Sequence, residues 1–231
     1  MKTLGVLGGM GPESTIEYYR LLVAGYRDRR RDGSYPPLLI NSVDVNRVLT
    51  LAAALNRQPL VEYLGAGLRR LARAGADFGL LPANTPHVVF GELSRESPLP
   101  LISIVEATCN FAKQRKFTKL GLFGTRSTMQ AGFYQQVFKE QGIELLLPSI
   151  EEQNYVHEKY VGELVAGRFL PETSDGLLAI ARKLKDDQGI EGLILGGTEL
   201  PLLLRDAAAL GIPFLDTTQI HVRAALDTML S

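Results

Sequence analysis

The chain has 231 residues, enough to bury the core of one large α/β domain or of two smaller lobes. Its 25 basic and 25 acidic residues balance, and the densest basic run, residues 27–31, is expected at a helix end, so we expect no nucleic-acid partner. No stretch approaches the ~20 apolar residues of a membrane helix. Cys109 is the only cysteine, which excludes a disulfide within the chain and indicates a reducing, cytoplasmic location.

Short apolar runs alternate with longer helical patterns in the first half of the chain. The apolar runs predict strands at residues 4–7, 38–41, 78–81 and 101–104. Helical patterns lie between them at residues 12–30 and 45–74. Strands that are apolar almost throughout and are separated by helices are typical of parallel sheets covered on both faces.

The second half of the chain repeats the first at a nearly constant offset. LGVLG at residues 4–8 matches LGLFG at 120–124, GADF at 75–78 matches GIEG at 189–192, and PLI at 100–102 matches PFL at 213–215. We therefore predict two similar α/β lobes of about four parallel strands, related by a pseudo-two-fold axis. Because ligands bind outside the carboxyl ends of parallel strands, we expect a ligand cleft between the lobes, lined by strand-end loops.

The first of these loops has the sequence GGMGPEST, at residues 8–15. Glycines let backbone amides approach a ligand, and the start of a helix favours an anion, so Gly9 and Met10 are expected to contact a small anion. The loop lacks both the third glycine of a dinucleotide fingerprint and the lysine of a P-loop. A tight structural turn is the alternative interpretation.

Two further loops follow equivalent strands in the two lobes. One has the sequence ANTPH at residues 83–87 and the other GTE at residues 197–199. Asn84, Thr85 and Thr198 offer amide and hydroxyl groups that suit the carboxylate or amino group of a small ligand, and Thr125 in the loop at residues 124–128 joins this predicted set. Helix capping by these residues is the alternative.

The motifs at residues 8–12, 84–87 and 196–201 together resemble the aspartate/glutamate racemase family, in order and spacing, over essentially the whole chain. The resemblance implies two Rossmann-like lobes, one formed by residues 1–98 with 212–231 and the other by residues 99–211. It also implies a homodimeric isomerase of a small amino or carboxylic acid that needs neither pyridoxal phosphate nor any other cofactor. In the family, one cysteine thiolate removes the α-proton and a second cysteine returns a proton on the opposite face.

Neither of those cysteines is present. The resemblance places Ala83 and Gly197 at their positions, and alanine and glycine carry no titratable proton. His87, Glu199 and Asp216 are possible substitutes if they lie close together. The alternatives are a structural histidine at 87 and an acidic residue favoured by the helix dipole at 199.

Arg47 aligns with an arginine that binds the substrate carboxylate in the family, a role that suits a bidentate donor, although an ordinary surface arginine is the alternative. Cys109 matches neither family position and is expected to be a small core residue. Three hypotheses follow. The chain is an enzyme with relocated acid/base groups, such as a racemase, lyase or decarboxylase; a binding or regulatory protein without the chemistry; or a variant whose cysteines were deliberately replaced, against which glycine at 197 argues mildly.

Overall fold

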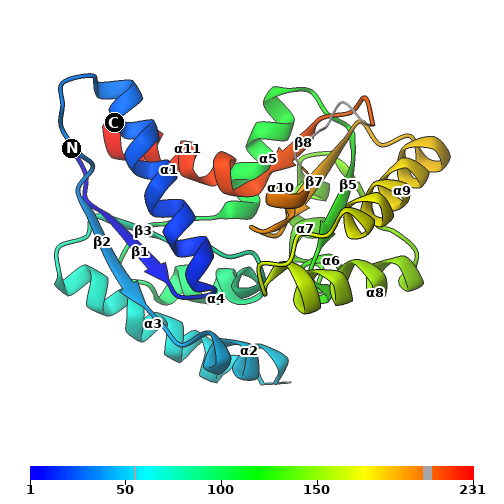
Figure 1. Ribbon diagram of the computed structural model, residues 1–231. Helices are drawn as coiled ribbons and strands as arrows, with labels where there is room; N and C mark the ends of the chain where they lie inside the picture. Colours follow the sequence, from blue (N-terminus) through cyan, green and yellow to red (C-terminus); the bar gives the residue numbers. More distant parts are fainter. Residues whose placement is uncertain (55, 205–209) are drawn as a thin grey trace. The chain divides into compact units, whose positions relative to one another are not determined.

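Two four-stranded parallel sheets form the framework of the protein (Figure 1). The computed structural model describes residues 1–54, 56–204 and 210–231. The first sheet has the order β2-β1-β3-β4 and the second the order β6-β5-β7-β8. Their strands are β1 (Leu4–Gly8), β2 (Leu38–Ser42), β3 (Phe78–Leu80), β4 (Leu101–Ile102), β5 (Lys119–Gly124), β6 (Glu144–Leu146), β7 (Gly192–Gly196) and β8 (Phe214–Asp216). The identical strand order confirms the predicted α/β class and the two similar sheets.

The helices that connect these strands are α1 (Pro12–Arg30), α2 (Val45–Ala53), α3 (Gln58–Arg73), η1 (Thr85–Val89), α4 (Phe90–Glu96), α5 (Ile104–Gln114), α6 (Arg126–Gln130), α7 (Phe133–Glu140), α8 (Ile150–Lys159), η2 (Tyr160–Leu164), α9 (Pro171–Gln188), α10 (Leu200–Leu203) and α11 (Thr217–Leu230). The helical pattern at residues 45–74 is divided into α2 and α3. Pro59 in the first turn of α3 explains the division, because proline lacks the amide that a continuous helix would use.

The chain divides into a first unit, Met1–Ala107 with Thr218–Ser231, and a second unit, Thr108–Thr217. These boundaries lie later in the chain than the expected ones at residues 98/99 and 211/212. The reason is strand pairing: β4 continues the first sheet beside β3, with Gly79 opposite Leu101, and β8 continues the second sheet beside β7, with Ile194 opposite Leu215. The C-terminal helix α11 returns to the first unit.

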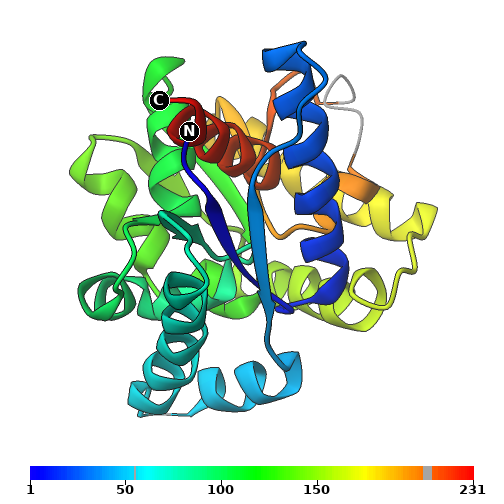
Figure 2. The ribbon, with the colours of Figure 1, turned by 90° about the vertical axis from the view of Figure 1, so that its left-hand side faces the viewer.

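The core of the first unit lies on both faces of its sheet. Val6 of β1 packs with Tyr18 of α1 and Leu226 of α11, whereas the next residue, Leu7, packs with Leu64 of α3. Because successive strand residues point to opposite faces, α1 and α11 cover one face and α3 covers the other, as Figure 2 shows. Burying one such apolar side chain contributes about 1.5–3 kcal/mol.

The second unit also has an apolar core between its sheet and two of its helices. Phe123 of β5 and Leu195 of β7 pack with Val156 of α8 and with Leu177 and Leu184 of α9. None of the helices within the described residues is long and apolar enough to cross a membrane.

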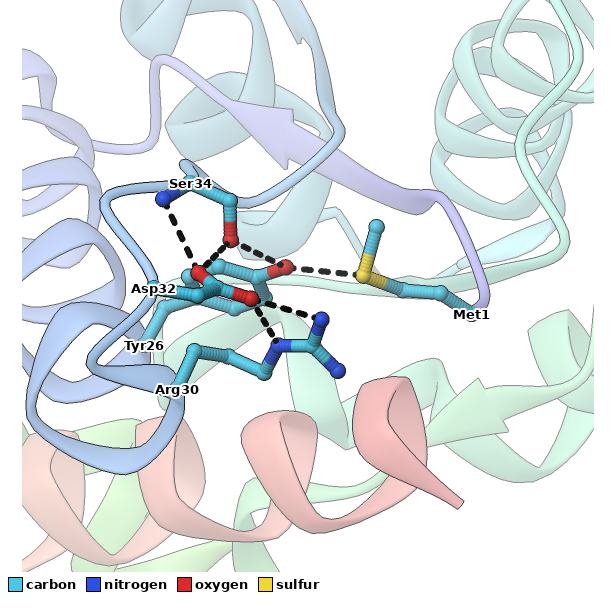
Figure 3. Close-up of polar contacts among 5 residues, drawn as sticks. All are labelled: Met1, Tyr26, Arg30, Asp32 and Ser34. Carbon is cyan, nitrogen blue, oxygen red and sulfur yellow. Dashed lines mark hydrogen bonds and ion pairs between the residues drawn. The ribbon is translucent and has the colours of Figure 1, made fainter.

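The basic end of α1 is held by a local polar cluster (Figure 3). Asp32 accepts hydrogen bonds from the amide of Ser34 at 3.0 Å and from the Arg30 guanidinium at 2.7 and 3.0 Å. The hydroxyl of Ser34 also donates to Asp32, and these bonds lower the pKa of the Asp32 carboxyl to about 2. The hydroxyl of Tyr26 in turn donates to Met1 Sδ at 2.8 Å. The cluster therefore fixes the turn that leads from α1 into β2.

Candidate functional site

The loop after β1 is compact and closely packed. The amide of Gly9 donates to the Thr15 hydroxyl at 2.9 Å, and the amide of Val43 donates to the Gly8 carbonyl at 2.9 Å. Gly9 has a φ of +92°, and a Cβ there would lie 2.2 Å from the Val43 carbonyl oxygen, so both the backbone and the space require glycine. Met10 is buried beside this turn.

The loop after β3 carries Ala83, Asn84 and Thr85. Ala83 and Asn84 are buried, and Thr85 is half-buried at the start of η1. Asn84 stands at the N-cap position of η1, but its side chain makes no capping hydrogen bond to that helix. Capping therefore does not account for the asparagine at this position.

His87 lies in η1 and is held at both ring nitrogens. Its Nε2 accepts the backbone amide of Ile104 at 3.2 Å, so Nδ1 carries the proton and donates to the Ala83 carbonyl at 2.8 Å. The ring stacks on Phe90 with centroids 4.8 Å apart. Burial, with the nearby His221, lowers the pKa of His87 to about 3. His87 is therefore a neutral residue that links two loops by hydrogen bonds. These contacts argue against a role for His87 as a catalytic acid or base.

His221 of α11 is a second buried histidine in the same unit, and both of its ring nitrogens form hydrogen bonds. Its Nε2 lies 2.9 Å from the Ile102 carbonyl and therefore donates to it, while Nδ1 accepts the Tyr18 hydroxyl at 2.9 Å. Burial lowers the pKa of His221 to about 4. Together the two histidines connect η1, β4, α1 and α11, and so fix the loop that contains Ala83.

The loop after β7 carries Gly197, Thr198 and Glu199. Gly197 is buried, and the other two residues are half-buried. The Thr198 hydroxyl donates to Glu199 Oε2 at 2.9 Å, and the Tyr160 hydroxyl donates to the same carboxylate oxygen. Tyr160 comes from the π-helical turn η2, far away in the sequence, and no local pattern identified it as part of this loop.

The loop after β5 caps the N-terminus of α6. Thr125 precedes α6, and its hydroxyl oxygen accepts the amide of Thr128 at 3.2 Å. The two hydroxyls lie 3.1 Å apart. This is the arrangement that the capping interpretation of the strand-end threonines predicts.

The remaining predicted residues have different environments. Arg47 is exposed in the first turn of α2, with its guanidinium carbon 4.6 Å from the centroid of the Tyr63 ring. Asp216 ends β8 and is half-buried. Cys109 is buried within α5, as expected of a core residue. Within the part of the chain that the structure describes, no group of three or more His, Cys, Asp or Glu residues is placed to hold a metal ion.

Comparison with known proteins gives a consistent result. Residues 7–225 match the model of the Asp/Glu/hydantoin racemase family. The chain is 26% identical to the broad specificity amino-acid racemase RacX of Bacillus subtilis, over 99% of this chain and 98% of that protein. It is also similar to the crystal structure of a proposed Asp/Glu racemase from Yersinia pestis, with 34% identity, a TM-score of 0.93 and complete coverage of both chains.

An aspartate racemase homologue from Pyrococcus horikoshii has a similar structure, with 31% identity, a TM-score of 0.87 and complete coverage of both chains. The agreement in sequence extends over nearly the whole length, and the agreement in structure includes both units. The chain therefore belongs to the Asp/Glu/hydantoin racemase family of isomerases.

Proposed function

We propose that this chain binds a small amino or carboxylic acid at the loops that follow its strands, and that it does not racemise this ligand by a two-thiol route. The observation that carries the proposal is the identity of Ala83 and Gly197, which the resemblance places at the family's cysteine positions. They follow β3 and β7, which occupy equivalent places in two sheets of the same order. Neither side chain can accept or donate a proton.

The chemistry around these loops supports a small, polar ligand. Asn84 and Thr85 follow β3, Thr198 follows β7, and the Gly9-Met10 turn follows β1. Amide and hydroxyl groups of this kind pair with carboxylate and amino groups. Arg47 adds an exposed guanidinium that suits a carboxylate.

A second candidate is an enzyme that protonates or deprotonates one face only, as a lyase or decarboxylase does. Glu199 favours it, because two hydroxyl groups hold its carboxylate at the loop after β7. Asp216, at the end of β8, is the second carboxylate to consider. His87 is not included, because both of its ring nitrogens are engaged and its pKa is about 3.

The test is incubation of the protein with L- and D-forms of alanine, serine, lysine, aspartate and glutamate in deuterated water. Saturation-transfer NMR detects binding, and loss of the α-proton signal detects exchange. We expect binding of at least one amino acid without exchange above a heat-denatured control. Removing one positioned acid or base typically costs about 10²–10⁴ in rate, so losing both thiols should leave little activity.

The isosteric variants Glu199→Gln and Asp216→Asn separate the two candidates. Exchange that disappears in either variant would support the one-face enzyme. Rapid exchange that both variants retain would contradict the proposal, since neither thiol chemistry nor these carboxylates would account for it. Absence of binding by every amino acid in the panel would contradict an amino acid as the ligand.

The resemblance also leads us to propose a homodimer that works in the cytoplasm without pyridoxal phosphate. The single, buried cysteine fits a reducing compartment. Light scattering after size-exclusion chromatography measures the oligomeric state. Repeating the exchange panel with added pyridoxal phosphate tests independence of this cofactor, which predicts unchanged rates.

A further inference from the structure

The space in front of Gly197 is filled by the ring of Tyr160. A Cβ added at Gly197 would lie 2.4 Å from Tyr160 Cε2, 2.8 Å from Cζ and 2.9 Å from the hydroxyl oxygen. Carbon atoms in favourable contact are about 3.5–4.0 Å apart, so any side chain at 197 would collide with the ring. Gly197 is not among the residues with positive φ, so the ring, and not the backbone, requires glycine here.

Tyr160 is fixed by packing and by hydrogen bonds. Its side chain belongs to the apolar cluster of the second unit, together with Val156, Leu164 and Leu200. It begins the π-helical turn η2, in which the amide of Val165 donates to the Tyr160 carbonyl at 3.0 Å. Such wide turns are uncommon and often occur at functional sites.

The hydroxyl of Tyr160 is equally constrained. It donates to Glu199 Oε2, which also accepts the Thr198 hydroxyl at 2.9 Å. Burial, reinforced by the Glu199 carboxylate, raises the pKa of this hydroxyl well above its usual value, so the ring is a neutral phenol. Retreat of the ring to admit a side chain at Gly197 would break these contacts.

We propose that Tyr160 takes the place of the family's second thiol and is the residue that determines which chemistry the loop after β7 can perform. Its ring excludes every side chain from position 197, and its hydroxyl holds Thr198 and Glu199 in one orientation. The inference rests on the proposed function, because position 197 matters to a substrate only if this loop binds one. It means that restoring cysteines at 83 and 197 is not enough to restore a two-thiol site.

The first test is a double-mutant cycle between positions 160 and 197, read as the melting temperature. Gly197→Ala should lower Tm by about 5 °C in the native background, as expected for overpacking in a chain of this size. In the Tyr160→Leu background, which lacks the colliding atoms, the same change should shift Tm by less than about 2 °C. Tyr160→Phe keeps the ring and should keep the full loss.

Gly162→Ala is the matched control, because Gly162 lies in the same turn and a Cβ there would meet no atom within 4 Å. It should change Tm equally in the native and Tyr160→Leu backgrounds. If Tyr160→Leu is too unstable to measure, Tyr160→Met offers a flexible side chain that can yield to a new Cβ. An equal loss from Gly197→Ala with tyrosine, leucine and methionine at 160 would overturn the inference.

The second test introduces the thiol itself. Gly197→Cys should react with iodoacetamide at least about tenfold faster when combined with Tyr160→Leu than with Tyr160 present, as measured by mass spectrometry of the labelled peptide. The triple variant Ala83→Cys, Gly197→Cys, Tyr160→Leu should exchange the α-protons of L-aspartate or L-glutamate at least about tenfold faster than the variant with Ala83→Cys and Gly197→Cys alone.

Negative results in the two tests would contradict different parts of the inference. Additive Tm changes, or equal thiol reactivity with and without Tyr160, would refute the role of Tyr160 whatever the ligand. Coupled Tm changes without α-proton exchange in the triple variant would leave Tyr160 as the residue that closes position 197, and would instead refute the proposed location of the substrate.

Discussion

The two buried histidines of the first unit should make the protein lose stability as the pH falls from 7 to 5. The pKa of His87 is lowered to about 3 and that of His221 to about 4, both chiefly by burial, against an ordinary value of 6.5. The unfolded chain therefore binds these two protons below pH 6.5, while the folded chain does not bind them until the pH approaches 3–4. The stability that the two neutral histidines contribute is therefore fully present above pH 6.5. It decreases as the pH falls from 6.5 towards the pKa values of the folded chain.

The magnitude follows from the width of the window. One pKa unit corresponds to about 1.4 kcal/mol, so each histidine should remove about 2 kcal/mol between pH 7 and pH 5, and the pair about 4 kcal/mol. This is a large part of the about 5–15 kcal/mol that stabilises a typical domain. Urea unfolding of the protein at pH 7, 6 and 5, followed by circular dichroism, measures the loss directly.

The variant His221→Gln isolates one of the two contributions. Glutamine can still donate to the Ile102 carbonyl and accept from the Tyr18 hydroxyl, but it does not titrate. Its loss of stability between pH 7 and pH 5 should be smaller than that of the native chain by about 2 kcal/mol. His157→Gln is the control, because His157 is less buried and should change the loss less. Equal losses in the native chain and in His221→Gln would refute the reasoning.

Three further substitutions, one of them with a matched control, test the structure elsewhere. Gly124→Ala should destabilise the second unit by about 1–3 kcal/mol, because its Cβ would lie 2.7 Å from the Gly196 carbonyl oxygen, whereas Gly91→Ala, with no atom within 4 Å, should be neutral or stabilising. Both are read by urea unfolding. Ser149→Ala should cost about 1 kcal/mol by removing the capping box of α8, measured in the same way. Asp32→Asn should lower Tm slightly at pH 7 but not at pH 2, where the carboxyl of Asp32 is itself becoming protonated.

The sheets could be predicted because their signal is local. Continuous apolar runs ending in glycine marked β1 and β5, and the constant offset between the two halves predicted the shared topology. The sheet to which β4 or β8 belongs depends on the sheet edge that this short strand joins. The pairing between neighbouring strands decides this, for example Leu80 of β3 opposite Ile102 of β4. The periodicity of the sequence does not reveal such pairing.

The candidate site stays a prediction, and the structure adds the surroundings of its residues. The strand-end loops were located by motif, but the roles of individual residues depended on tertiary contacts. Whether His87 is reactive or structural is decided by the amide of Ile104 and the carbonyl of Ala83, which occupy its two nitrogens. The importance of Tyr160 arises from a glycine that is distant in sequence, and only packing connects the two residues.

The two kinds of glycine in these loops explain how such a fold can keep its framework and change its chemistry. At Gly124 an added Cβ would lie 2.7 Å from the backbone carbonyl oxygen of Gly196. No substitution at position 196 removes this atom, because it belongs to the backbone. At Gly197 the obstacle is the side chain of Tyr160, which a single substitution can remove. Constraints of the first kind preserve the ends of the strands, where we propose that a ligand binds. A constraint of the second kind can be relieved by a single substitution, so we expect the residues at positions 197 and 160 to change together, a small residue at 197 with a large side chain at 160.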